Sequence, residues 1–469
     1  MKKLILILIV VQVILFLIFG AIGIIKAYIK YELGYSDTND DVVYDESNVK
    51  YFLKDDGTYL AIIEGEEQIT SFKLPATRND KSLTEVEIGR NVTSIPPSAF
   101  EDCIYLNKVT IGTDVREIFK DAFANCTALM SITIPETVTY VDAYAFSACY
   151  RLAEIINRSD CTIAPPYTLG VHNGESRIFR SDGFVYYSYN GECSLINYFG
   201  TESEVVLPNE LGGEIYRINT FAFGKTGVRS LTVPECVRAV GDRAFYGCDR
   251  LVSVTLPSAV TDIGIYAFAN CSSLNSVQLP SELTTVAGAL FDGCTALENI
   301  ILPASVTTIG NYAFSNCTAL SNIGLPEGLV KVGDHTFEGC TSLRELELPV
   351  TLEAIGFGAF SGCESLVSIE LPDSVTSVST AAFEGCLNLE RVTVGKGVTS
   401  IGYAAFGGCE RLESVEFKDV STWYEVNDKK DTEYELDVSD SAKNAEKLKS
   451  AETDLMNHLN GAYYTLKKR

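Results

Sequence analysis

Few residues in this sequence could carry out catalysis. The chain has 469 residues but only three histidines, His172, His335 and His458, which leaves little material for a histidine-based metal or catalytic site. It contains no H-E-x-x-H, no G-x-S-x-G and no paired C-x-x-C. The segment Gly224–Thr226 (GKT) imitates the end of a phosphate-binding loop, but Asn219 stands where the first glycine of that loop should be. We therefore predict no catalytic residues, no metal and no cofactor.

Fourteen cysteines offer either disulfide or thiol chemistry. Eleven of them recur three residues after a phenylalanine, so their side chains should all point the same way. Parallel side chains fit the dihedral angle of a disulfide poorly, whereas small buried thiols explain the spacing without a covalent link. We predict a ladder of reduced core cysteines. Cys161, Cys193 and Cys236 lie off the ladder, and one bond among them stays open as an alternative.

Composition narrows the class of protein. The sequence has 62 acidic and 37 basic residues, a formal charge of −25, and 46% hydrophobic residues. This apolar content is enough to build a core, which excludes a wholly disordered chain. The acidic balance argues against nucleic acid as a partner, because phosphates are bound by clustered lysine and arginine.

One sequence unit is repeated twelve times. Its marker phenylalanines are 23 residues apart, except for one step of 22 and one gap of 77. The markers are Phe100, Phe123, Phe146, Phe223, Phe245, Phe268, Phe291, Phe314, Phe337, Phe360, Phe383 and Phe406. Such regularity indicates a solenoid of stacked coils.

Each unit predicts one coil with its apolar side chains turned inward. In one unit Leu251, Val254 and Leu256 have the spacing of a leucine-rich-repeat strand, and Pro257 ends it. Gly264 allows a tight turn before the Ala-Phe-x-x-Cys segment returns across the core. Since no coil buries its apolar side alone, neighbours should stack about 4.8 Å apart with the phenylalanines in a column. We predict a β-rich leucine-rich-repeat solenoid with a parallel strand ladder and one elongated core.

Residues 4–25 predict a membrane anchor. These 22 consecutive residues carry no charge, and as a helix they span about 33 Å against roughly 30 Å of hydrocarbon. We predict a transmembrane signal anchor with residues 1–3 in the cytoplasm and the rest of the chain outside, after an acidic linker at 26–50. The alternative is a cleaved signal peptide, which would make the protein secreted.

Two hairpin modules precede the two blocks of repeats. The predicted parts are a β-hairpin cap at 51–82, a first block of repeats at 83–157, an insertion with a β-hairpin at 158–215, a second block at 216–417 and a C-terminal cap at 418–469. The simpler interpretation of the insertion is a cap over an exposed apolar end. A binding role is the alternative, because Tyr186, Tyr187 and Tyr189 offer aromatic contacts on a rigid scaffold.

The C-terminal segment predicts short strands and one helix. Trp423–Tyr424 and Tyr434–Val438 suggest strands that close the last coil, and Ser441–Asn460 has the apolar spacing of a helix. The basic residues at Lys467–Arg469 are expected to form a solvated end of the chain.

The unit AF-x-x-C-x-x-L-x-x-V-x-L-P-x-x-V-x-x-I-G resembles the BspA-type leucine-rich repeat. The resemblance covers about residues 83–417, broken by the insertion, and the tail from Trp423 to Leu448 is similar to endings seen on bacterial members. It implies an exported or surface-attached protein, and several members are linked to adhesion to host matrix proteins or to other cells. The repeat motif itself carries no partner identity.

The exposed side of the strand ladder is the predicted contact surface. Its outward residues are small and polar in the first part of the second block and are mostly carboxylates later. A broad sheet of this kind suits extended contact with a protein or glycan. The candidate partner-binding residues are Glu345, Glu347, Glu370, Arg391 and Glu416 on the strands, and Tyr186, Tyr187 and Tyr189 in the insertion. The carboxylates suit a basic patch or calcium, and a solvated acidic face without a partner is the alternative.

Together these features predict a membrane-anchored extracellular scaffold for recognition or adhesion, without catalysis, whose partner is a host or cell-surface protein or glycan. A structural cell-envelope protein without a specific ligand is the alternative. An enzyme that uses the insertion is a third hypothesis, and it requires a cleft with perturbed titrating groups beside residues 158–215.

Overall fold

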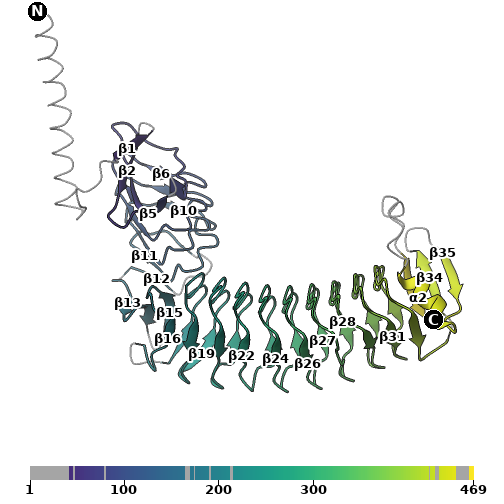
Figure 1. The fold of residues 1–469 in the computed structure, drawn as a ribbon. Coiled ribbons are helices and arrows are strands. Elements are labelled where there is room, and N and C mark those ends of the chain that lie inside the picture. Colours follow the sequence, from purple (N-terminus) through teal and green to yellow (C-terminus); the bar gives the residue numbers. More distant parts are fainter. Residues whose placement is uncertain are drawn as a thin grey trace, which may run out of the picture. The chain divides into compact units, whose positions relative to one another are not determined.

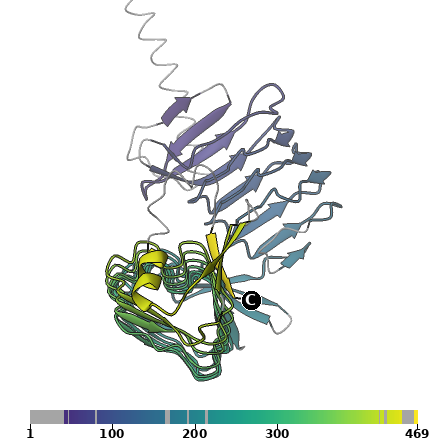
Figure 2. The same ribbon diagram turned by 90° about the vertical axis from the view of Figure 1, so that its right-hand side faces the viewer.

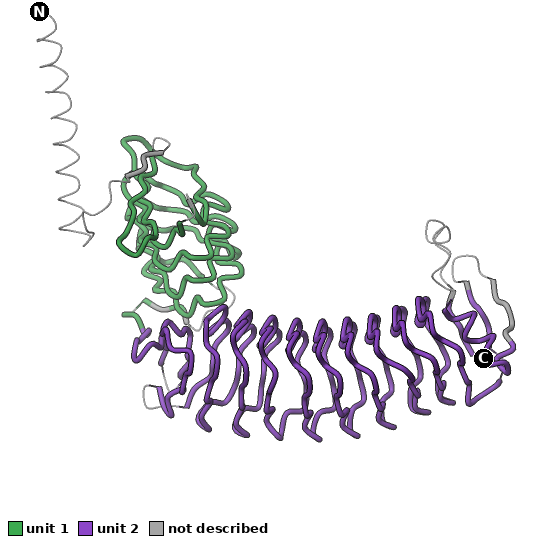
Figure 3. Tube along the Cα trace, viewed as in Figure 1, with its two compact units in different colours: residues 1–176 green, residues 177–469 purple. Residues whose placement is uncertain are grey.

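The chain forms two compact units, residues 1–176 and 177–469 (Figure 3). The computed structural model describes residues 42–45, 48–78, 81–163, 170–173, 175–189, 192–211, 215–421, 423–427, 432–449 and 464–468. Each unit has its own cluster of buried hydrophobic side chains. The prediction of a repeat solenoid is confirmed, but the core is divided in two, because a segment without the repeat stands between the two blocks.

Each repeat contributes two short parallel strands. We call the strand in the Leu-x-x-Val-x-Leu part the front strand, and the two- to four-residue strand before the Ala-Phe pair the rear strand. In unit 1 the front strands are β5 (Lys81–Ile88), β7 (Lys108–Ile111), β9 (Ser131–Ile134) and β11 (Glu154–Asn157), joined by β12 (Gly170–His172). Its rear strands are β6 (Ser94–Ile95), β8 (Glu117–Ile118) and β10 (Tyr140–Val141).

Unit 2 repeats this pattern over nine turns, which lie side by side in Figure 1 and superimpose nearly end-on in Figure 2. Its front strands are β16 (Glu204–Val206), β18 (Ser230–Thr232), β20 (Ser253–Thr255), β22 (Ser276–Gln278), β24 (Asn299–Ile301), β26 (Asn322–Gly324), β29 (Ser368–Glu370), β31 (Arg391–Val394) and β33 (Ser414–Phe417). Its rear strands are β17 (Tyr216–Ile218), β19 (Val237–Val240), β21 (Asp262–Ile263), β23 (Thr285–Val286), β25 (Thr308–Ile309), β27 (Lys331–Val332), β28 (Ala354–Ile355), β30 (Ser377–Val378) and β32 (Ser400–Ile401). Where front strands pair from β18 onward, the register is 23 residues, as Ser253 with Ser276, whereas the first turns of the unit pair with other offsets, as Glu204 with Ser230.

A hairpin stands at the start of each unit, but the two hairpins join different sheets. In unit 1, β1 (Val42–Asp45), β2 (Val49–Leu53) and β3 (Tyr59–Ile63) run antiparallel, and β3 pairs in parallel with front strand β5, which also pairs with β4 (Thr77–Arg78). In unit 2, β13 (Ile178–Ser181), β14 (Phe184–Tyr189) and β15 (Glu192–Tyr198) run antiparallel, and β15 pairs in parallel with rear strand β17. The first module therefore extends the front sheet of its unit, and the second extends the rear sheet.

The marker phenylalanines form the predicted column in each unit. All twelve are at most 1% exposed, and consecutive rings within a unit are 5.1–5.7 Å apart. Each column also continues beyond the repeats, because the Phe72 ring lies 5.6 Å from Phe100 and the Tyr198 ring lies 5.2 Å from Phe223. The segments that precede the repeats thus cover the first phenylalanine with an aromatic ring.

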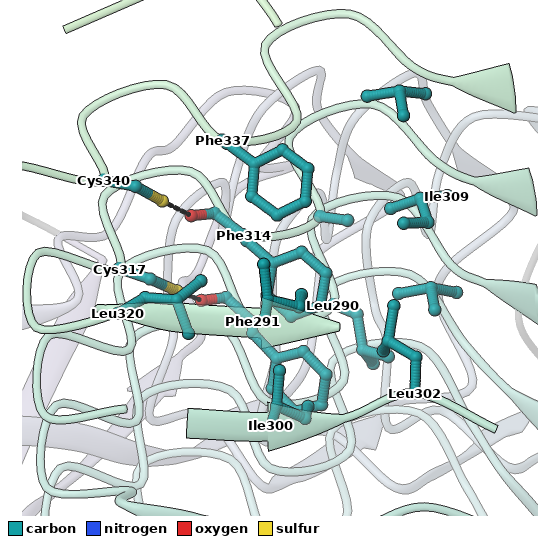
Figure 4. Close-up of a cluster of buried hydrophobic side chains, with 14 of the residues drawn as sticks. Leu290, Phe291, Ile300, Leu302, Ile309, Phe314, Cys317, Leu320, Phe337 and Cys340 are labelled. Carbon is teal, nitrogen blue, oxygen red and sulfur yellow. Dashed lines mark hydrogen bonds between the residues drawn. The ribbon is translucent and has the colours of Figure 1, made fainter. Parts of the chain in front are cut away.

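All fourteen cysteines have free thiols, and the eleven ladder cysteines are buried. Each ladder thiol also donates a hydrogen bond to a carbonyl of the preceding turn, a contact that the sequence did not indicate. Ten thiols donate to the backbone carbonyl of the marker phenylalanine in the previous turn at 3.0–3.3 Å, as Cys317 does to Phe291 and Cys340 to Phe314 (Figure 4). Cys103 in the first turn donates to Leu74 at 3.5 Å. The ladder therefore ties neighbouring turns together.

Glycine is required at Gly264 for a different reason than predicted. Gly264 has no positive φ; a Cβ there would lie 2.4 Å from the amide nitrogen of Asp242, so the glycine is required by close packing against the preceding turn. The left-handed conformation falls instead two residues before the marker phenylalanine, for example at Tyr312 (φ 60°) and His335 (φ 53°). The backbone needs this conformation in most turns, whatever the side chain.

The C-terminal segment closes both strand stacks of unit 2. Strand β36 (Tyr464–Lys468) runs antiparallel to the last rear strand, β32, and to β34 (Trp423–Asn427), which pairs with β35 (Thr432–Leu436). Helix α2 (Ser441–Lys449) covers the last front strand, where Asn444 Nδ2 donates to the carbonyls of Val415 at 3.1 Å and Val438 at 2.9 Å. Covered edges prevent pairing with another chain.

The prediction of a solvated end at 467–469 is wrong for Lys468, which lies in β36 and donates to the carboxylate of Asp419. This lysine is held because the strand returns across the last turn. The predicted anchor at 4–25, the linker as far as residue 41, the hairpin turn at 190–191 and the helical pattern beyond residue 449 lie outside the described residues. Within the described ranges, no helix has the length and hydropathy needed to span a bilayer.

Candidate functional site

The outward residues of the front strands of unit 2 form an exposed surface, which we call the front face. Inward residues of these strands are buried and outward residues are exposed, as in β20, β24, β26 and β29. The predicted residues Glu345, Glu347, Glu370, Arg391 and Glu416 are all exposed on this face. The front face also presents an apolar side chain, since Ile301 is 87% exposed.

The strand ladder of the front face is interrupted between β22 and β24 and again at Glu345–Leu348. β26 pairs only with β24, β29 pairs only with β31, and the turn between them has no front strand among the described residues. None of the amides from Glu345 to Leu348 donates a hydrogen bond to another described residue. Glu347 and Glu370 occupy equivalent positions in adjacent turns, and like charges facing each other across a ladder oppose pairing.

A groove of about 860 Å³ lies over this interruption and is lined by residues of consecutive turns. Its volume is in the range of small-ligand sites. Gly324 supplies part of its opening, because a Cβ built at Gly324 meets nothing within 4 Å. The groove, hereafter the front groove, brings together three of the predicted residues: Glu345, Glu347 and Glu370.

The front groove is strongly acidic. Five carboxylates line it (Glu327, Glu345, Glu347, Glu370 and Asp373), against one lysine, Lys418. Lys418 Nζ lies 2.6 Å from Glu370 Oε1, although the two residues are 48 positions apart in the chain. This hydrogen bond to Glu370, together with the neighbouring carboxylates, raises the pKa of Lys418 above its ordinary value. Glu345 and Glu347 form no ion pair with any described residue.

The other predicted strand residues do not line the front groove. Arg391 is on β31 and its Nη1 lies 2.9 Å from Glu390 Oε2. Glu416 is exposed on β33. Neither side chain lines the groove. The predicted strand residues therefore divide into three that line the groove and two on later turns that do not.

The tyrosines of β14 do not form one surface. Tyr187 is only 4% exposed, whereas Tyr186 packs against the core of unit 2 and stacks on Phe179 at 5.5 Å. Tyr189 is 43% exposed, with the Arg177 guanidinium 3.2 Å from its ring centroid. Successive side chains of a strand point to opposite faces, so the three tyrosines cannot all contact one partner.

Sequence reasoning did not single out Gly324 and Lys418, nor the carboxylates of Glu327 and Asp373, as parts of this groove. A signal for Gly324 was present, because glycine is unusual among the outward residues of the front strands. Lys418 lies after the last repeat, and only the stacking of turns brings it to Glu370.

The described residues provide no evidence of a metal centre. They contain no group of three or more histidine, cysteine, aspartate or glutamate side chains that could hold a metal ion. His335 is stacked on Tyr312 at 4.7 Å and meets the edge of Phe357 at 4.8 Å, and its Nδ1 lies 3.0 Å from Glu338 Oε2. Rather than lying freely on the surface, His335 is held in a local packing arrangement.

Comparison with known families agrees with the repeat geometry. The profile described as "BspA type Leucine rich repeat region" matches in six copies, within residues 57–170, 216–344 and 307–426. The chain belongs to this BspA-type leucine-rich repeat family. The repeats of both units fall inside the matched ranges.

Solved structures of bacterial leucine-rich repeat proteins are similar to this BspA-type protein. A leucine rich cell surface protein from Faecalibacterium prausnitzii A2-165 is 22% identical, with a TM-score of 0.39 over 82% of this chain and 96% of that chain. A leucine-rich repeat protein from Eubacterium ventriosum ATCC 27560 is 22% identical, with a TM-score of 0.43 over 68% of this chain and 93% of that chain. The T. pallidum leucine-rich repeat protein is 29% identical, with a TM-score of 0.30 over 50% of this chain and 90% of that chain. A comparison with curated proteins finds no match.

Proposed function

We propose that this BspA-type protein is a non-catalytic recognition scaffold, which binds a protein or glycan partner through the front face of unit 2. The observation that carries the proposal is the front groove. It is an open, acidic depression on a surface whose side chains point away from a close-packed core. Repeat proteins use extended surfaces of this kind for binding, because the stack holds many side chains in fixed positions.

The proposal places the protein at the cell surface. Residues 4–25 would anchor it, with the repeats outside the membrane and the acidic segment before residue 50 as a tether. The resemblance to exported family members supports this location. Surface labelling of intact cells with a membrane-impermeant reagent would test it; a protein protected until the cells are lysed would contradict the proposed location.

Binding would be tested with the purified full-length chain against matrix proteins, glycans and intact cells. We expect saturable binding to at least one of them, weakened by Glu345→Lys/Glu347→Lys. A matched control is Glu364→Lys/Glu410→Lys, which changes net charge equally at two exposed loop residues outside the groove. No saturable binding to any partner would favour the alternative of a structural envelope protein.

A further inference from the structure

The front groove combines a carboxylate-rich part with an apolar part. Leu325 and Leu348 are half-buried in its lining, and Val350 at its border is 73% exposed. Its five carboxylates outnumber its one lysine by four, which leaves four negative charges uncompensated. A ligand that fits both parts has an aliphatic portion and a positively charged end. Lysine and arginine side chains have that form, because their methylene stems pack on apolar surface while the charge stays in contact with polar groups.

The chain already places one ammonium group in the front groove. Lys418 Nζ is 2.6 Å from Glu370 Oε1, and Lys418 lies two turns beyond the glutamate that it contacts. This contact shows that a lysine side chain can reach the groove from a neighbouring segment and bind one of its carboxylates. Glu345 and Glu347 line the same groove, and no described cation contacts them.

We propose that the front groove binds a lysine or arginine side chain carried by an extended, basic segment of a protein partner. The side-chain cation contacts Glu345 and Glu347, and its stem lies over Leu325 and Leu348. This inference rests on the proposed function and names the chemistry of the partner. Charge complementarity carries it, because a neutral glycan leaves the four excess charges uncompensated.

Gly324 provides a test of the groove that leaves the carboxylates unchanged. A Cβ there meets nothing within 4 Å and the residue has no positive φ, so Gly324→Gln should fold normally while its side chain occupies the opening. Ser276→Gln is the matched control. Ser276 is an outward residue of β22, two turns before the equivalent residue Asn322 of β26, so the variant adds the same side chain to the same face outside the groove. Equal unfolding midpoints of the two variants and the parent chain would establish that folding is unaffected.

The probe is a fluorescent, end-blocked peptide Ser-Lys-Ser-Lys-Ser, with Ser-norleucine-Ser-norleucine-Ser as a peptide that keeps the stem and lacks the charge. With the full-length chain in low salt, we expect the lysine peptide to bind at least about tenfold more tightly. Glu345→Gln/Glu347→Gln and Gly324→Gln should each weaken it about tenfold or more, and Ser276→Gln and Glu364→Gln/Glu410→Gln should leave it within about twofold.

Three results would overturn the inference: equal binding of both peptides, unchanged binding by Gly324→Gln, or an equal loss in Glu364→Gln/Glu410→Gln, which would indicate attraction to overall charge. Its failure is distinguishable from that of the proposed function. If the screen of matrix proteins, glycans and cells finds a partner that the groove variants bind normally, the recognition role stands and the basic ligand is wrong. If the peptide binds in the groove but no partner or cell surface binds, the groove chemistry stands and the recognition role is wrong.

Discussion

The thiol of Cys340 donates a hydrogen bond to the backbone carbonyl of Phe314, one turn earlier in the stack, at 3.1 Å (Figure 4). The same carbonyl accepts the amide of Cys317 at 3.2 Å. One carbonyl thus receives a bond within its own turn and a second from the next turn. Since this arrangement recurs along the ladder, the cysteines add a bond between turns that packing alone would not supply.

Removing the Cys340 thiol should therefore destabilise the protein. Cys340→Ala should lower the free energy of unfolding by about 1–3 kcal/mol, because it deletes a buried donor and leaves a small void. Cys340→Ser keeps a donor in almost the same place, so it should destabilise the protein by about 0.5–1.5 kcal/mol less than Cys340→Ala does. Denaturant unfolding monitored by circular dichroism measures both values. Equal losses of unfolding free energy in the two variants would mean that the thiol hydrogen bond does not contribute to stability.

Truncating the phenylalanine column should have a larger effect. Phe291 is 0% exposed and stacks between Phe268 at 5.7 Å and Phe314 at 5.5 Å, so Phe291→Ala should cost about 3–5 kcal/mol. Tyr312→Ala is a suitable control, because its side chain is 40% exposed and should cost much less. A loss below about 1 kcal/mol for Phe291→Ala would show that the column is dispensable.

Gly358 should not tolerate a side chain. Its φ is +56°, and a Cβ would lie 2.9 Å from His335 Nδ1, which is itself held between Tyr312 and Phe357. We expect Gly358→Ala to cost about 1–2 kcal/mol and to shift the NMR signals of His335. Ala381 has the same backbone conformation one turn later (φ 57°), which shows that alanine is accepted where no ring is in the way. Unchanged His335 signals would contradict the packing described here.

The ladder should make stability depend on alkaline pH. Burial raises the pKa of the Cys103, Cys149 and Cys340 thiols to about 12. A raised folded pKa gives stability that is complete below the unfolded value near 9 and is lost as the pH rises toward 12. Each such thiol should lower the free energy of unfolding by about 1.4 kcal/mol per pH unit in that window. Cys340→Ser should remove the contribution of one thiol from this pH dependence. Unfolding free energies from pH 8 to 11 would measure the slope; no fall above pH 9 would contradict the prediction.

Acid should loosen the C-terminal strand. Hydrogen bonds from Lys468 and from the amide of Ser421 hold the pKa of Asp419 well below its ordinary value of 3.8. A lowered folded pKa gives stability that is present above the unfolded value and is lost as the pH falls through the folded one. Trp423, the single tryptophan, lies in β34 beside β36 and is 1% exposed.

We therefore expect Trp423 emission to shift to the red below about pH 4, before the circular dichroism of the repeats changes. Asp419→Asn should show this shift at neutral pH, because it removes the charge that binds Lys468. Asp437→Asn is a control for an exposed aspartate outside that contact. Identical acid profiles for the parent chain and Asp419→Asn would exclude the contact as the cause.

The sequence predicted the features that repeat and missed those that occur once. The spacing of the phenylalanines and cysteines was enough to indicate the solenoid, because every turn reports the same packing constraint. It could not show that Cys340 bonds to Phe314, since a buried thiol and a bonded thiol leave the same spacing. It also missed β36, because Tyr464–Lys468 has no repeat partner and its pairing with β32 depends on a return of the chain.

The candidate site was predicted in the same uneven way. Alternation along the strands correctly placed Glu345, Glu347 and Glu370 on the outside, because every second side chain of a strand points outward. The groove that joins them depends on the lost pairing of one front strand and on the missing side chain at Gly324. Neither effect appears in residue spacing alone.

Contacts between adjacent turns have a mechanical consequence for unit 2. Tension applied along the stack would meet short strand ladders at most steps, together with one ring contact and one thiol hydrogen bond between turns, so the turns should peel away one after another from a terminus. A released turn of 23 residues would lengthen the chain by about 75 Å beyond the ~5 Å that it occupied. The scaffold would act as an extensible spring, which absorbs a pulling force in small increments and winds back when the load is removed.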